Sequence, residues 1–194
     1  MRSTPTVVLA SSSAYRRALL ARLLADFESL SPGVDESALD GESPARMAAR
    51  LAAAKAQHCA NLRPGAIVIG SDQAPDLDGV VLRKPGGREA AIDQLSACSG
   101  RAVRFSTAVA VIAADGRIDA HVDATTVQFR DVSATEIERY VDAEKPFDCA
   151  GAFKVEGLGV SLFDRVESVD PTALQGLPLI WLAASLRRLG IPLP

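Results

Sequence analysis

Asp72 is the residue of this sequence best placed to do chemistry. It follows an apolar, β-branched run, residues 66–69, which predicts a buried strand. Because ligands in open α/β sheets gather beyond the carboxyl ends of strands, a carboxylate just past Gly70 and Ser71 would face a substrate. There it could orient and deprotonate a water molecule. The structural alternative is an Asx-turn in which the Asp72 side chain merely closes the strand.

A serine-rich turn supplies a candidate anion site. Ser11 to Ser13 lie between a strand predicted over residues 6–10 and a helix predicted over residues 15–24. Unpaired N–H groups and the helix dipole attract anions to a helix N-terminus, and the serine hydroxyls with Arg16 would complete a phosphate cradle. The alternative is that these serines only cap the helix. The turn lacks the glycines and the lysine of a Walker loop.

Two more charged residues could join these groups. Glu36 lies in a predicted loop after a short strand over residues 27–31, and its carboxylate could bind a divalent cation if the loop folds back toward Asp72. Lys55 lies on a helix predicted over residues 44–62, at the flank of its apolar face. From there it could reach a phosphate, or its ammonium could snorkel to water. We expect that face to consist of Met47, Leu51, Ala54, His58 and Leu62.

Hairpins should return further cations to the same region. An Asp-Gly turn at residues 78–79 predicts a hairpin whose second arm brings Arg83 and Lys84 back beside Asp72. A second Asp-Gly turn, at residues 115–116, predicts a longer, structural hairpin. Further helices are predicted over residues 87–98, from a capping box at residues 133–136 to about residue 142, and over residues 178–189, and a strand is predicted over residues 161–166. A loop at residues 149–159 contains three glycines and carries Phe153, Lys154 and Glu156, which suits the approach of backbone to a ligand.

Composition indicates one α/β domain. The chain has 194 residues, of which 48% are hydrophobic and 23% charged, with a formal charge of −3. This charge gives no overall attraction to nucleic acid or to an anionic membrane, so a polyanion would need a local cluster of Lys and Arg. Cys59, Cys98 and Cys149 are widely spaced and odd in number, which predicts reduced thiols in the core of a cytoplasmic protein. Strands and helices alternate at first and then give way to hairpins, which predicts a mixed sheet.

Eight short motifs together resemble the Maf family of nucleotide pyrophosphatases over nearly the whole chain. Each motif alone has low specificity, but their order and spacing match the family. They are Ser11-Ser12-Ser13-Ala14-Tyr15-Arg16-Arg17, Asp35-Glu36, Lys55-Ala56, Gly70-Ser71-Asp72-Gln73, Lys84-Pro85, Ser99-Gly100, Ala150-Gly151 and Gly176-Leu177-Pro178-Leu179.

The resemblance implies hydrolysis of a nucleoside triphosphate to the monophosphate and diphosphate. It also implies a two-lobed Maf/ITPase-like α/β fold over residues 1–194, with a mixed, twisted sheet flanked by helices around a central cleft. A divalent cation, Mg²⁺ or Mn²⁺, is expected as cofactor. The expected partners are a small nucleotide and a second copy of the chain in a homodimer, without nucleic acid or membrane, in the cytoplasm.

The form of two motifs is similar to the subgroup that acts on 7-methyl-GTP. Gln73 and Glu156 both match that subgroup, whereas the dTTP/UTP subgroup has Thr and Gln at the corresponding places. Tyr15 departs from the pattern, because this subgroup often has Trp there. The resemblance to this subgroup implies a house-cleaning activity that keeps modified nucleotides out of nucleic acids. A dTTP/UTP-type pyrophosphatase and a nucleotide-binding regulator of division are the alternatives.

On this resemblance the candidate residues divide into four tasks. Asp72 would activate water, and Glu36 would hold the metal. The cationic base of 7-methyl-GTP would stack on Tyr15 and bind the carboxylate of Glu156, while Gln73 would contact base or sugar. The residues expected to bind phosphate are Ser11, Ser13, Arg16, Lys55 and Lys84.

Overall fold

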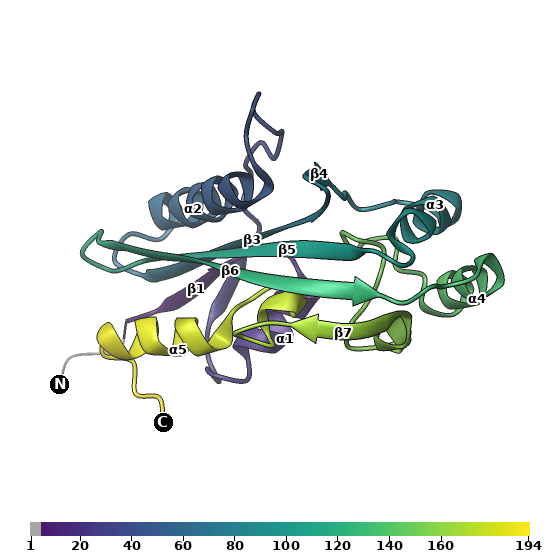
Figure 1. Cartoon of the computed structure of the whole chain (residues 1–194). Helices are drawn as coiled ribbons and strands as arrows, with labels where there is room; N and C mark the ends of the chain where they lie inside the picture. Colours follow the sequence, from purple (N-terminus) through teal and green to yellow (C-terminus); the bar gives the residue numbers. More distant parts are fainter. Residues whose placement is uncertain (1–4) are drawn as a thin grey trace.

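The computed structural model describes residues 5–194 as one seven-stranded mixed sheet with helices on both faces (Figure 1). The strand order is β2-β1-β3-β5-β6-β7, and the short β4 pairs with β3. The strands are β1 (Val7–Ala10), β2 (Glu28–Leu30), β3 (Ile67–Leu77), β4 (Val80–Val81), β5 (Ala102–Ile112), β6 (Ile118–Phe129) and β7 (Phe163–Glu167). The helices are α1 (Ala14–Leu20), α2 (Pro44–Leu62), α3 (Arg88–Cys98), α4 (Ala134–Glu144) and α5 (Leu179–Arg188), with short 3₁₀ turns η1 (Leu158–Leu162) and η2 (Ala173–Gln175). The predicted mixed α/β class is confirmed.

β3 is the strand around which the site is built. It runs parallel to β1 and antiparallel to β5, and β1 stops at Ala10, opposite Gly70. The expectation that Asp72 lies past the end of a strand is therefore wrong, because β3 continues through Asp72 to Leu77. Pairing with β5 is continuous from Val68 to Asp76, and this ladder outweighs the low β propensity of Asp and Pro. Asp72 instead lies just beyond the end of β1.

α2 packs closely on β3 because small residues face the sheet. A Cβ atom at Gly70 would lie 2.2 Å from the carbonyl oxygen of Ala52 and 2.6 Å from the amide of Ala56. The helix is therefore rotated from the predicted face: Leu62 is 53% exposed, Ala54 and His58 are only partly buried, and Lys55 is buried. Close backbone approach favours alanine over the larger apolar residues that a periodicity argument selects. Met47 and Leu51 are buried as expected.

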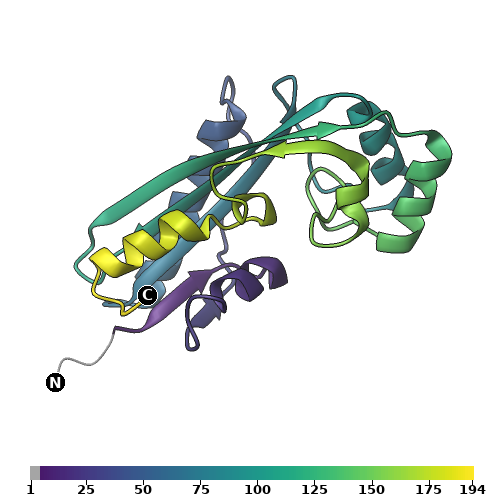
Figure 2. The same ribbon diagram turned by 60° about the horizontal axis from the view of Figure 1, so that its bottom comes forward.

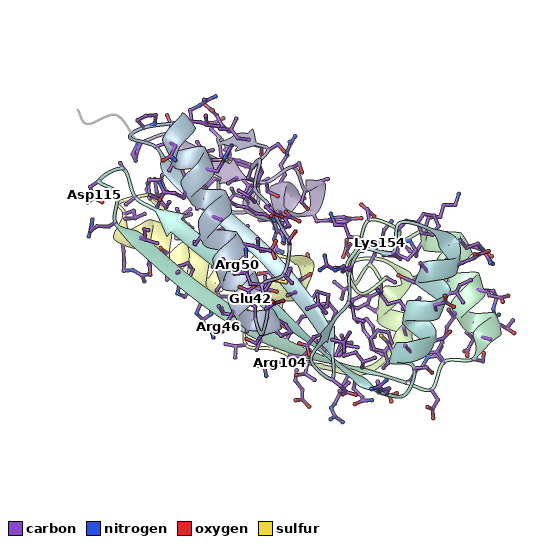
Figure 3. All side chains as sticks on the ribbon, turned by 90° about the horizontal axis from the view of Figure 1, so that it is seen from above. Glu42, Arg46, Arg50, Arg104, Asp115 and Lys154 are labelled. Carbon is purple, nitrogen blue, oxygen red and sulfur yellow. The ribbon has the colours of Figure 1, made fainter. Side chains whose placement is uncertain are left out.

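The long strands join two lobes (Figure 3). In the first, α2 covers one face of the sheet while α1 and α5 cover the other (Figure 1). In the second, α3 and α4 lie at the far ends of β5 and β6 (Figure 2). They pack there around an aromatic core that includes Phe105, Phe129 and Phe153. The predicted two-lobed arrangement is confirmed, and it leaves room for a cleft between the lobes.

The remaining elements follow the predictions with small differences. Both Asp-Gly hairpins form, and the capping box between Ser133 and Glu136 begins α4. α1 ends at Leu20 rather than at residue 24, because the amides of Arg22 and Leu23 bond to carbonyls three residues back and tighten the turn that follows. The three cysteines are free thiols. None of the helices described here has the length and apolarity needed to cross a membrane.

Candidate active site

A cleft of about 720 Å³ opens between the two lobes, where β1 ends and β3 continues. All ten candidate site residues line it, whereas Lys154 does not and instead donates to the carbonyl oxygen of Glu144. The ten residues are Ser11, Ser13, Tyr15, Arg16, Glu36, Lys55, Asp72, Gln73, Lys84 and Glu156. They come from six separate parts of the chain, and the fold brings these parts together.

Lys55 joins the two candidate carboxylates. Its Nζ atom lies 2.6 Å from Oδ1 of Asp72 and 2.6 Å from Oε1 of Glu36. The side chain of Lys55 is 7% exposed and that of Asp72 is 12% exposed, whereas that of Glu36 is 60% exposed. α2 places Lys55 on its buried side, and the loop before α2 folds back so that Glu36 reaches the same ammonium. The snorkelling alternative for Lys55 is thus excluded by its contacts.

The two carboxyl groups have opposite pKa shifts. Burial raises the pKa of Asp72 above its usual range, and the positive charges of Lys55 and Arg16 offset this only in part. The hydrogen bond from Lys55 lowers the pKa of Glu36, and the nearby charge of Lys84 acts in the same direction. Asp72 therefore has the environment of a proton acceptor, and Glu36 that of a permanent anion.

Arg16 is held in a fixed orientation at the cleft. Its Nε donates a hydrogen bond of 2.9 Å to the carbonyl oxygen of Gly176, which leaves the terminal nitrogens of the guanidinium for a ligand. Ser71 Oγ lies 2.9 Å from the same carbonyl, so this oxygen ties β3 to the turn after η2. Ser13 accepts a hydrogen bond of 3.4 Å from the Arg16 amide, and it therefore caps α1 while also lining the cleft.

The amide of Gln73 is used for structure. Its Nε2 donates to Thr107 Oγ1 at 2.9 Å and to the carbonyls of Ala173 and Leu174 at 3.0 and 3.1 Å. Thr107 donates in turn to the Ala173 carbonyl at 2.9 Å. Thr107 is fully buried beside Gln73 on β5, and sequence reasoning missed it because a threonine in a strand is ordinary. The pair holds the η2 turn against the sheet, and only Oε1 of Gln73 is left for a ligand.

The other end of the cleft is aromatic and acidic. The Sγ atom of Cys149 lies 3.8 Å from the hydroxyl of Tyr15 and 3.5 Å from Oδ1 of Asp148. Burial raises the pKa of the Tyr15 hydroxyl and raises that of the Cys149 thiol to about 11. Cys149 is only partly buried, which corrects its assignment to the core, and Asp148 was not foreseen as a cleft residue. Glu156 lies on the same wall and is exposed.

The β3–β4 hairpin brings its two cations to the cleft, as the Asp-Gly turn predicts, and Lys84 lies near Glu36. Arg83 and Lys84 both line the cleft and are exposed, and the charge of Lys84 reaches Glu36. Lys55 and Arg16 thus lie near Asp72 and Lys84 lies near Glu36, whereas Asp148 and Glu156 lie near Tyr15. The cleft therefore has a cationic end, where these three cations outnumber the carboxylates of Asp72 and Glu36, and an anionic end beside Tyr15.

Comparison with known proteins agrees with this arrangement. Residues 6–189 match the family described as Maf-like protein. A Xanthomonas oryzae pv. oryzae protein named 7-methyl-GTP pyrophosphatase is 56% identical over 190 residues, which are 98% of this chain and 100% of that protein. A Pseudomonas aeruginosa protein of the same name is 50% identical over 191 residues, covering 98% of this chain and 100% of that protein.

Solved structures are similar in fold. The Ham1 protein of Staphylococcus aureus aligns over 94% of this chain and 98% of its own, with a TM-score of 0.53 and 15% identity. A HAM1 protein of Coxiella burnetii aligns over 95% of this chain and 100% of its own, with a TM-score of 0.53 and 16% identity. At these identities the likeness concerns the fold alone.

Proposed function

Because the chain belongs to the Maf family, we propose that it hydrolyses 7-methyl-GTP to 7-methyl-GMP and diphosphate. The relatives named for this activity are about half identical to the chain over nearly its full length. The observation that carries the proposal is the polarity of the cleft, which sets Lys55, Arg16 and Lys84 around Asp72 and Glu36 at one end and two carboxylates beside Tyr15 at the other. An anionic triphosphate joined to a cationic base has the complementary polarity.

The cationic end would bind the triphosphate. Arg16 presents its terminal nitrogens from a fixed Nε, and Lys84 adds a mobile charge on the hairpin. The α1 N-terminus, with Ser11 and Ser13 in front of it, contributes partial positive charge at the same wall. These groups would neutralise the substrate and align its α-phosphorus toward Asp72.

Asp72 would accept the proton of the attacking water. Its raised pKa makes it a stronger base than an ordinary aspartate, while Lys55 keeps the carboxylate oriented by a 2.6 Å contact. Water attack at the α-phosphorus breaks the bond to the bridging oxygen, and diphosphate leaves with that bonding pair. The proton taken by Asp72 is then released to solvent or to a product oxygen.

Mg²⁺ or Mn²⁺ would be held by Glu36, while Asp72 stays the base. The carboxylate of Glu36 already faces a cationic atom, Lys55 Nζ, and it has a second oxygen beyond that contact. Magnesium sites commonly combine one or two carboxylates with substrate phosphates, so a larger protein cluster is not required. When bound, the cation would supply charge neutralisation and lower the pKa of a coordinated water.

The anionic end would select the methylated base. The positive charge of 7-methylguanine favours stacking on Tyr15 and pairing with the carboxylate of Glu156. Asp148 adds a second negative charge to the same end. Neutral guanine can stack and donate hydrogen bonds too, but it lacks the charge contribution to both interactions, so GTP should be the poorer substrate.

The test is diphosphate release from 7-methyl-GTP, GTP, dTTP and UTP with Mg²⁺ or Mn²⁺. We expect selective release from 7-methyl-GTP, loss of at least about 100-fold in Asp72→Asn, and reduced preference over GTP in Glu156→Gln. Preference for dTTP or UTP would support the other subgroup. Binding of nucleotides without turnover would instead support a regulator. A homodimer and a cytoplasmic location stay predictions, to be checked by light scattering and cell fractionation.

A further inference from the structure

The loop that carries Glu36 has little to hold it in place. It connects β2 to α2 over residues 31–43, and none of these residues is buried. Leu39, the largest apolar side chain in the loop, is 57% exposed. Glu36 reaches Lys55, yet the side chain of Glu36 is 60% exposed, and one such ion pair contributes little order. Something else must position a segment of this length.

Arg50 binds the loop at two places. Its Nε and Nη2 donate to the two carboxylate oxygens of Glu42, both at 2.7 Å, which is the two-pronged geometry of a strong arginine–carboxylate pair. Nη2 also donates to the carbonyl oxygen of Ser37 at 2.9 Å. Oε2 of Glu42 accepts a further hydrogen bond of 3.2 Å from the amide of Leu39. The guanidinium therefore grips the residue directly after Glu36 and the end of the loop together.

The pair is better shielded than a typical surface ion pair. The side chain of Glu42 is 8% exposed and that of Arg50 is 31% exposed. Figure 3 shows Glu42 and Arg50 beside each other at the start of α2, with Arg46 nearby. Since α2 also carries Lys55, one rigid helix fixes both the cation and the loop whose carboxylate binds it.

We propose that Arg50 and Glu42 are positioning residues that order the 31–43 loop and thereby place Glu36 in the cleft. The proposal rests on the proposed function only for its effect on rate. The ordering of the loop is a property of the chain without nucleotide, so it can be tested separately. Neither residue touches the candidate reacting groups.

Hydrogen–deuterium exchange of the nucleotide-free protein tests the ordering. We expect the 31–43 amides to exchange at least about 10-fold faster in Arg50→Gln, and α2 itself to keep its protection. Arg46→Gln is the matched control, because Arg46 lies one turn earlier on the same helix, is exposed and forms no ion pair within residues 5–194. It should leave the loop unchanged. Equal exchange in wild type and Arg50→Gln would overturn the proposal.

Kinetics test the connection to Glu36. Residues that orient a ligand or catalytic group typically affect activity by about 10- to 100-fold, and we expect kcat/KM to fall by this factor in Arg50→Gln. Arg50→Lys should recover only part of the lost kcat/KM, because an ammonium group cannot pair with both carboxylate oxygens of Glu42 as the planar guanidinium does. In a Glu36→Gln background, Arg50→Gln should have no further effect. Faster exchange with unchanged kcat/KM, or a full additional loss in the Glu36→Gln background, would refute a role through Glu36. If no nucleotide is hydrolysed at all, the exchange result still decides the ordering.

Discussion

The ammonium group of Lys55 lies 2.6 Å from Oδ1 of Asp72, and both side chains are nearly buried. A second carboxylate, that of Glu36, lies 2.6 Å from the same nitrogen on the open side of the cleft. Removing the lysine would leave the poorly hydrated carboxylate of Asp72 facing a second negative charge without a cation between them. The pair thus links the stability of the first lobe to the chemistry of the cleft.

Lys55→Met should lower the free energy of unfolding by about 3 kcal/mol, because it leaves a buried carboxylate without its cation. Combining it with Asp72→Leu should recover most of that loss, since the double variant leaves no buried carboxylate without a cation. Urea denaturation of the three proteins measures both effects. A single variant as stable as the wild type would contradict a buried charged pair.

Activity should depend on pH through Asp72. Because its pKa is raised, the carboxyl group binds a proton at a higher pH than an ordinary aspartate, and the protonated form cannot act as a base. The acidic limb of the kcat/KM profile should therefore lie above pH 4, the ordinary range of aspartate. Lys55→Met should move this limb to higher pH, because it removes a positive charge that lowers the pKa of Asp72. Lys55→Arg keeps that charge and should shift the limb less. A limb at pH 4 or below would show that Asp72 is not the base.

Gly70→Ala should disrupt the site by displacing α2, the helix that carries Lys55. The new methyl group would lie 2.2 Å from a backbone oxygen of α2, so the helix must move away from β3 and take Lys55 from Asp72. We expect a loss of about 3 kcal/mol in the free energy of unfolding, with a parallel loss of activity. Gly87→Ala is the control, because its Cβ meets no atom within 4 Å and should change stability by less than about 1 kcal/mol.

Thr107→Val should weaken the orientation of Arg16 through the turn that carries Gly176. It keeps the shape but removes the hydroxyl that joins Gln73 to the Ala173 carbonyl, so the turn that presents Gly176 loses a support. The cost should be about 1–3 kcal/mol, and kcat/KM should fall by about 10-fold. Thr107→Ser should restore both. Wild-type stability and activity in Thr107→Val would show that the hydroxyl does not support the turn.

Much of the site could be predicted because its signals are local. The Asp-Gly turn returns Lys84, the Ser-Pro pair begins the helix of Lys55, and the serine turn precedes Arg16. Each depends on a few neighbouring residues. Their meeting in one cleft was expected from the resemblance, and the structure places them there.

Other features depend on contacts that no local pattern encodes. The length of β3 is set by β5, which lies about 30 residues further along the chain, and not by its own propensity. The buried face of α2 is set by how near its backbone approaches Gly70. Two hydrogen-bonded pairs, Arg50 with Glu42 and Gln73 with Thr107, consist of polar residues that no local motif distinguishes.

The early end of β1 leaves part of one edge of β3 unpaired within the described residues. β3 continues past Ala10, and residues 71–74 have no strand beside them on that edge within the described part of the chain. Asp72, Gln73 and Ala74 line the cleft along this edge, so a nucleotide there would lie where a neighbouring strand would otherwise run and could bind main-chain amides and carbonyls. Such binding would survive most substitutions of side chains, so substrate preference could change by mutation at the rim while the ability to hold a nucleotide is kept.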